Sequence, residues 1–178
     1  MNSGNYYKLQ PGQNKIRVLS DAITGYVIWV DGKPVRSKDY PQVMPTGFDS
    51  ESGVRHFWAF VVWSYRDERV QLMEITQATI RDQIHNLYTI EEYGEPQGYD
   101  IVITKTGEKL NTEYSVTALP PKPVAGSIKA AYERVKVNLD ALYEGGNPFE
   151  ESDTAAVEEE IFDDEEPRPL KKPSSLNK

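Results

Sequence analysis

The stretch HFWAFVVWSY, from His56 to Tyr65, constrains the fold most, because apolar side chains occupy both alternating sets of its positions. A strand with one face on a core and the other in water should alternate apolar and polar residues. Here one face carries Phe57, Ala59, Val61, Trp63 and Tyr65, and the other carries Trp58, Phe60 and Val62, with Ser64 as the polar exception. The second face is therefore either covered by more of the protein or is a surface on which a flat ligand stacks.

The length of 178 residues predicts one domain of ordinary size plus appendages. The absence of cysteine excludes disulfides, thiolate metal sites and cysteine nucleophiles, and it fits a reducing cytoplasm. Two histidines, His56 and His85, leave little for a histidine-based metal site, and we expect no cofactor. No stretch is typical of a signal peptide or approaches the roughly 18 apolar residues of a membrane span. We therefore expect a soluble, cytoplasmic protein.

The net charge of −8 is concentrated near the C-terminus. Residues 147–166 contain ten acids and no base, and residues 167–178 contain four bases and no acid. The remaining residues, 1–146, hold 18 acids and 16 bases, a balance of only −2. The acidity of the whole chain is therefore no argument against a polyanionic ligand for its main part.

The order of the predicted elements favours a small β-barrel. The first is a long β-rich run over 14–30 with a bend near Gly25, followed by a turn at 31–33, a return strand at 35–38 and a loop over 40–55. Hairpin strands over 56–65 and 70–75 come next. A helix then begins after Thr76, with Ile80, Ile84, Leu87 and Tyr88 on one face, and a second hairpin covers 99–117. A helix between the third and fourth strands is the order of the OB-fold. A β-sandwich with one helical connection would give a similar order, but a closed barrel removes exposed strand edges. We predict a mainly β fold, an OB-fold-like five-stranded barrel over residues 1–124.

The chain beyond the barrel is predicted in two parts. After a proline-rich connector, the spacing of apolar residues predicts a C-terminal helix over 125–146, which either packs back on the barrel or contacts a partner. Residues 147–178, first acidic and then basic, contain few apolar residues and are predicted to be disordered.

No catalytic motif is present: the sequence lacks GxxxxGK[ST], GxSxG, HExxH and CxxC. Asp100, Glu108 and Lys109 resemble the carboxylate and lysine set of a metal-dependent nuclease. Two of them belong to a hairpin turn, however, where Glu and Lys are common solvated residues. We expect neither an enzyme nor a metal site.

Aromatic and basic residues instead favour binding of a single-stranded nucleic acid, because flat rings stack on any base and cations follow the phosphates. The predicted stacking residues are Tyr26, Trp29, Trp58, Trp63 and Tyr65, and the predicted phosphate contacts are Lys15, Arg17, Arg36, Lys38, Arg55, Arg66 and Lys105. The two faces of the strands cannot be told apart by pattern alone, so we expect some of these aromatics to lie in the core.

The runs FWAFVVWSYRDERVQLMEITQATIRDQI and GYDIVITKTGEKLNTEYSVTALPPKP, together with the acidic tail, resemble the single-stranded DNA-binding proteins of tailed bacteriophages. The resemblance covers roughly residues 10–125. It implies an OB-fold that coats single-stranded DNA in phage replication and recombination, in the host cytoplasm. The chain departs from the zinc-containing phage members, since it has no cysteine.

The resemblance also implies that the acidic tail contacts replication or recombination proteins, with Phe149, Phe162, Asp163 and Asp164 as candidate contacts. Sixteen residues follow Phe162, which is unlike the bacterial-type tails that end on a Phe. Physically, a tethered polyanion competes with DNA for the cations of the binding surface at high effective concentration. Two other functions remain open: a module that docks a peptide or partner subunit, and an RNA-binding protein.

Overall fold

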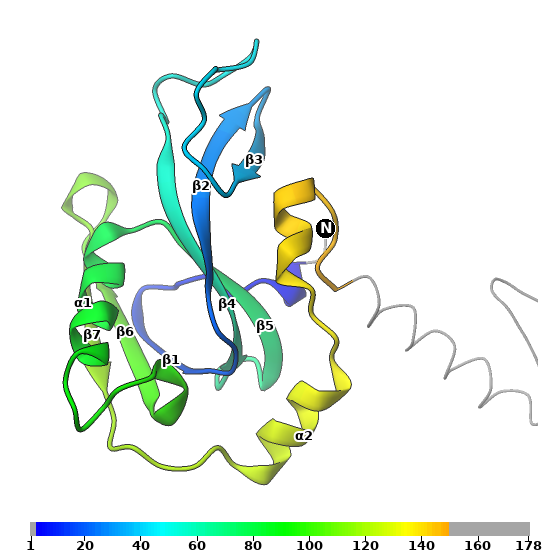
Figure 1. The fold of residues 1–178 in the computed structure, drawn as a ribbon. Helices are drawn as coiled ribbons and strands as arrows, with labels where there is room; N and C mark the ends of the chain where they lie inside the picture. Colours follow the sequence, from blue (N-terminus) through cyan, green and yellow to red (C-terminus); the bar gives the residue numbers. More distant parts are fainter. Residues whose placement is uncertain (1–2, 150–178) are drawn as a thin grey trace, which may run out of the picture.

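The computed structural model describes residues 3–149, which form a mainly β fold with two short α-helices (Figure 1). The strands are β1 (Gly12–Val18), β2 (Ile23–Val30), β3 (Lys33–Ser37), β4 (Arg55–Ser64), β5 (Arg69–Ile75), β6 (Asp100–Thr106) and β7 (Glu113–Ala118). The helices are α1 (Ala78–Tyr88) and α2 (Gly126–Arg134), and the 3-10 turns are η1 (Ser3–Asn5), η2 (Pro96–Gly98), η3 (Lys109–Asn111) and η4 (Leu139–Glu144). None of the helices among residues 3–149 is long and apolar enough to cross a bilayer.

Strand β4 is the centre of a seven-stranded antiparallel sheet. One of its edges pairs with β5, and its other edge pairs first with β2 and then with β1. Ile23 lies opposite Ala59 and Val18 lies opposite Val62, so β1 and β2 follow one another along the same edge, with a bend at residues 19–22. Strands β6 and β7 extend the sheet beyond β1.

Residues 24–57 form an arm that projects from the rest of the sheet (Figure 1). Its hairpin between β2 and β3 turns at Asp31 and Gly32, both with positive φ (52° and 80°), as a two-residue type I′ turn requires. Gly25 is needed where β2 passes β3, because a Cβ atom there would collide with the carbonyl oxygen of Ser37. The tight turn at Asp31 and Gly32 and the close strand contact at Gly25 therefore fix the backbone conformation of the arm.

The predicted mainly β class and the helix after residue 76 are confirmed, but the count of five strands is wrong, and a closed barrel is not observed. Within residues 3–149, no pairing joins β5 to β7. Helix α1 packs beside β7 instead, where the Gln83 amide donates to the Tyr114 carbonyl at 3.0 Å and accepts from the Val116 N–H at 2.8 Å. A side chain thus occupies backbone groups of β7 that barrel closure would pair with a strand.

Beyond the arm, both faces of β4 are covered by the chain itself. On the inner face, Phe60 and Val62 join a core that contains Ile16, Met73, Ile80 and Ile101 among its buried members. On the outer face, Phe57 and Ala59 pack with Leu72, Leu142 and Phe149, and with the half-buried Val135 and Val137. We call the second group the outer cluster. The segment after residue 119 therefore covers the face of HFWAFVVWSY that carries Phe57 and Ala59.

The prediction of one helix over 125–146 is wrong. Helix α2 ends at Arg134, Val135 has extended backbone angles (φ −99°, ψ 120°), and η4 follows. The reason is that Val135 and Val137 contact the outer cluster in this extended stretch. The interpretation that this segment packs back on the sheet is supported by those contacts.

Phe149 was predicted to be a tail residue that contacts partners, and this is also wrong. Its side chain is only 2% exposed and belongs to the outer cluster. Its ring meets that of Tyr6 edge to face, with centroids 6.2 Å apart. The folded part thus extends at least to residue 149, two residues beyond the predicted start of the tail.

Replacing Phe149 with leucine should lower the free energy of unfolding by about 1–2 kcal/mol, because the smaller side chain leaves part of the outer cluster unfilled. Urea unfolding of the full chain measures this. Leu110→Ala is the control, since Leu110 is fully exposed, and it should change stability by less than about 0.5 kcal/mol. An equal, negligible effect of both substitutions would contradict the burial of Phe149.

Candidate nucleic-acid interface

An aromatic surface lies on the inner side of the arm, on the face of β4 that continues from the inner core. Tyr26 and His56 are paired across β2 and β4, with ring centroids 5.4 Å apart. Tyr40, 52% exposed, meets Tyr26 edge to face at 5.3 Å. Arg81 of α1 contacts the His56 ring of this surface. We call Tyr26, Tyr40, His56 and Arg81 the arm face.

Arg81 holds His56 in one tautomer. The guanidinium Nη1 lies 2.8 Å from His56 Nδ1 and can only donate, so Nδ1 accepts and the proton of the neutral ring sits on Nε2. Nε2 then donates to Thr24 Oγ1, 3.0 Å away. Burial, and next the charge of Arg81, lower the pKa of His56 below its ordinary value. The arm face therefore presents a neutral imidazole beside a guanidinium.

This lowered pKa makes stability depend on pH. Since the unfolded chain binds the His56 proton more readily than the folded chain, the contribution of His56 is complete above about pH 6.5 and is lost as the pH falls through and below that value. In urea unfolding between about pH 7.5 and 5.5, the wild type should lose stability more steeply than His56→Gln. Leu110→Ala, which changes a fully exposed residue and removes no titratable group, is the control and should follow the wild type. If the free energy of unfolding changes with pH in the same way for the wild type and His56→Gln, the lowered pKa of His56 is contradicted.

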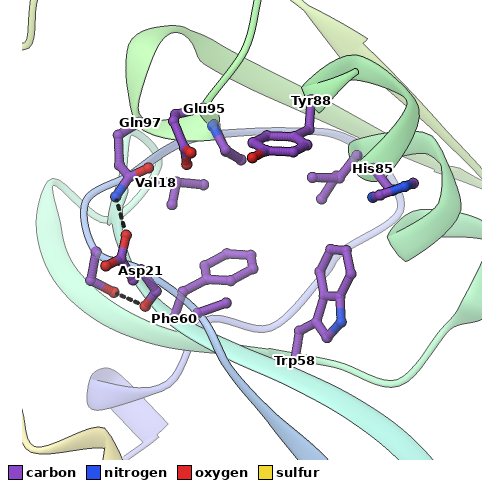
Figure 2. A pocket seen from close by; sticks show the side chains of 12 residues that line it. Val18, Asp21, Trp58, Phe60, His85, Tyr88, Glu95 and Gln97 are labelled. Atoms are coloured by element: carbon purple, nitrogen blue, oxygen red, sulfur yellow. Dashed lines mark hydrogen bonds between the residues drawn. The ribbon is translucent and has the colours of Figure 1, made fainter. Parts of the chain in front are cut away.

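Trp58 follows His56 on the same face of β4 and lines a cavity of about 180 Å³. The cavity lies between β4, the bend at 19–22, the end of α1 and η2 (Figure 2). Trp58 is half-buried and also packs against the inner core. Of the predicted stacking residues, Tyr26 and Trp58 are thus the two that the fold places on one continuous face.

The other predicted stacking residues lie elsewhere. Trp29 is half-buried and packs against the outer cluster. Trp63 is half-buried and lies on the outer face, opposite Arg17 and Val70. The Tyr65 hydroxyl donates to Asp100 Oδ1 at 2.9 Å, and Lys15 Nζ lies 4.4 Å from the centre of its ring. Burial, followed by the bond to Asp100, raises the pKa of Tyr65 to about 12.

Arg17 is a correction among the predicted phosphate contacts, because its side chain is only 2% exposed. It lies 3.3 Å from the fully buried Asp100 and donates to the carbonyls of Gln97 (3.0 and 2.8 Å) and Lys122 (2.7 Å). Arg17 therefore ties η2 and the segment after β7 to β1. The sequence pattern missed this, since an Arg in an alternating strand is normally exposed.

Two lysines extend from this buried pair toward solvent. Lys15 Nζ is 4.0 Å and Lys122 Nζ is 3.7 Å from Asp100 Oδ2, and both side chains are substantially exposed. Because three cations surround one carboxylate, positive charge is left at the surface here. Lys15 was predicted as a phosphate contact, whereas Lys122 was missed because it lies in the proline-rich connector.

The remaining predicted cations are dispersed. Arg36 is bound by Glu74 through two hydrogen bonds of 2.8 Å, so it is not free for phosphate. Lys38 lies over the ring of Tyr143 at 5.3 Å, and Arg55 is exposed and donates to the Ser52 carbonyl. Lys105 is half-buried in β6.

Arg66 lies near Lys8 and Arg69 around an open hollow of about 420 Å³, which Tyr6 also lines. Its guanidinium donates to Asn14 Oδ1 at 3.1 Å and to the Lys8 carbonyl at 3.0 Å. It also lies over the Tyr7 ring at 4.6 Å. This second basic and aromatic area contains only one predicted site residue. Phe162, Asp163 and Asp164 lie outside the described residues.

The structure thus joins Tyr26 and Trp58 to three residues that the sequence did not single out as contacts: Tyr40, His56 and Arg81. These come from a loop, a strand and a helix, so no single-segment pattern could have assembled them. Comparison of the chain with protein-family models, with curated proteins and with solved structures finds no match.

Proposed function

We propose that the protein binds single-stranded DNA without strong sequence preference and coats it, in phage replication or recombination. One observation carries the proposal: the arm face puts Tyr26, Tyr40 and His56 beside the guanidinium of Arg81, on a projecting part of the sheet. Stacking on aromatic rings tolerates any base, and the cation serves the phosphates. No catalytic group is needed for this activity.

The proposed architecture is a variant of the OB-fold. The strand order β5-β4-β1-β6-β7 with a helix after β5 supports it, if the bent pair β1 and β2 counts as one strand. In OB-folds, the strand 2–3 face and the loops between strands 1 and 2 and between strands 4 and 5 hold oligonucleotides. The arm corresponds to the first of these loops, which agrees with a ligand on the arm face.

The surface lysines around Asp100 and the cations around Arg66 would supply further phosphate contacts. Acids at residues 150–166 would compete with DNA for these cations and, once displaced, would recruit replication or recombination proteins. The tail residues Phe162, Asp163 and Asp164 belong to this part of the proposal.

The test is a titration of labelled oligo-dT with the full chain and with a chain ending at Glu150, which retains the buried Phe149. Binding should weaken with salt, with a log–log slope of about −0.7 per phosphate contacted, and truncation should tighten it at low salt. Duplex DNA and RNA of equal length are the competitors. Unchanged affinity after truncation would contradict the proposal that the tail competes with DNA. A preference for RNA over DNA would mean that RNA is the ligand.

A partner-docking module is the second candidate, favoured by one observation. The arm loop exposes apolar side chains, with Val43 82% exposed next to Met44 and near Tyr40. Exposed apolar residues on a projecting arm are typical of protein contacts. If no oligonucleotide binds at any salt concentration, this candidate replaces the first.

A further inference from the structure

We propose that the cavity beside Trp58 binds one base of the DNA strand and prefers cytosine, because its rim offers hydrogen-bond acceptors to an exocyclic amino group. This rests on the proposed function and adds to it a base-selective position. The cavity measures about 180 Å³, and Trp58 in its lining shares a face of β4 with His56 of the arm face. Its walls, its rim and its place in the fold each support the assignment.

The walls fit a single flat ring. Figure 2 shows Trp58 and Phe60 on one side of the cavity and Tyr88 on the other, and Val18 and Ile84 complete the apolar lining. A dry cavity of roughly 150 Å³ holds a benzene molecule. A pyrimidine is one six-membered ring with small substituents, so it suits this volume better than a two-ring purine. Aromatic walls favour such a ring by stacking.

The rim supplies carboxylates, which accept hydrogen bonds and cannot donate them when ionised. Asp21 and Glu95 both line the cavity and are otherwise exposed. The Gln97 amide donates to Asp21 Oδ1 at 3.1 Å, and the Gln97 carbonyl is in turn held by Arg17. The buried Arg17 thereby fixes the position of one side of the rim.

Acceptors of this kind distinguish the two pyrimidines. Cytosine carries an N4 amino group, the usual partner of Asp and Glu, whereas thymine carries an oxygen at the same position. The carboxylates of Asp21 and Glu95 would therefore hydrogen-bond cytosine and repel the O4 atom of thymine. The same charges disfavour a phosphate, so only the base would enter the cavity.

The cavity continues the arm face. His56, Trp58 and Phe60 share one face of β4, and alternate residues of a strand are about 7 Å apart. A DNA strand stacked on Tyr26 and His56 would therefore reach Trp58, which lines the cavity. Each protein molecule would select only one of the bases that it contacts. Its other contacts would not depend on sequence, so the protein could still coat DNA.

The experiment compares oligo-dC, oligo-dT and oligo-dA of equal length at mildly alkaline pH, using the full chain and the double variant Asp21→Ala/Glu95→Ala. The wild type should prefer oligo-dC over oligo-dT by about fivefold or more, the lower range for one base-specific contact. The double variant should lose that preference. Because the properties of the free oligonucleotides are the same for both proteins, the change in the ratio reports the protein contact alone.

The control variant Asp140→Ala/Glu144→Ala removes the same charge from η4, on the outer side of the sheet, and should keep the wild-type ratio. Equal affinity of the wild type for oligo-dC and oligo-dT would overturn the base site, as would a preference that survives in the double variant. Tighter binding of oligo-dA than of oligo-dC would overturn the single-ring fit. Binding of all three without discrimination leaves the proposed function intact, whereas no binding of any would refute both.

Discussion

Replacing Arg17 with methionine is expected to destabilise the protein by about 3–5 kcal/mol, because it takes the closest cation, itself buried, away from a fully buried carboxylate. Asp100 is fully buried, and its Oδ2 already has no hydrogen-bond partner. The substitution also removes the donors to the carbonyls of Gln97 and Lys122, so two connecting segments lose their attachment to β1. Urea unfolding followed by far-ultraviolet circular dichroism measures the loss.

Two comparisons separate this buried pair from the charges around it. Lys122→Met removes an exposed cation near the same carboxylate and should cost less than about 1 kcal/mol. The double variant Arg17→Met/Asp100→Leu should recover part of the loss, since the buried carboxylate is then removed together with its buried cation. A loss in Arg17→Met no larger than in Lys122→Met would show that Arg17 is a surface residue, as the sequence pattern predicted.

The contrast between β4 and Arg17 shows which parts of this fold a single sequence can predict. Apolar residues occupy both the odd and the even positions of β4, which correctly indicated that neither face is a simple solvent-exposed strand face. The explanation lies at Val135, Val137 and Phe149, some 70 to 90 residues further along the chain. Local periodicity predicts that a face has to be covered, but it has no information on which distant segment covers it.

The same limit applies to charged residues. The run KIRV in β1 alternates as a half-exposed strand does, so the pattern predicts that Arg17 is a surface cation. Its burial depends on Asp100, which is 83 positions away and pairs with it across β1 and β6. The helix prediction over 125–146 failed for a related reason, since contacts of Val135 and Val137 with the sheet outweighed a pattern that also suits a helix.

For the candidate site, the sequence predicted the residue types better than their grouping. Tyr26 and Trp58 were singled out and do share a face, but Trp29, Trp63 and Tyr65 proved to be on the outer side or in other contacts. Tyr40 and Arg81 were not predicted because a loop and a helix bring them in. Strand faces become distinguishable only once the register of β2, β4 and β5 is known.

The double variant Tyr26→Ala/Tyr40→Ala is expected to bind oligo-dT far more weakly than the wild type. Each base that stacks on an aromatic ring contributes about 1–3 kcal/mol, so each substitution should weaken binding by roughly fivefold to more than a hundredfold. Fluorescence anisotropy with a labelled oligonucleotide measures this, and thermal midpoints exclude a loss of folding. Tyr132→Ala on α2, remote from the arm in Figure 1, is the matched control and should bind normally.

Two further outcomes decide what the tyrosines do. The variant Tyr26→Phe/Tyr40→Phe keeps both π-faces and should restore most of the affinity, because stacking needs no hydroxyl. The salt slope should stay unchanged in the alanine variant, since no phosphate contact is removed, whereas Lys15→Ala and Lys122→Ala should each reduce its magnitude by about 0.7. Full affinity in the alanine variant would remove the arm face from the interface. A reduced salt slope in that variant would mean that the tyrosines position phosphate contacts, because stacking alone leaves the slope unchanged.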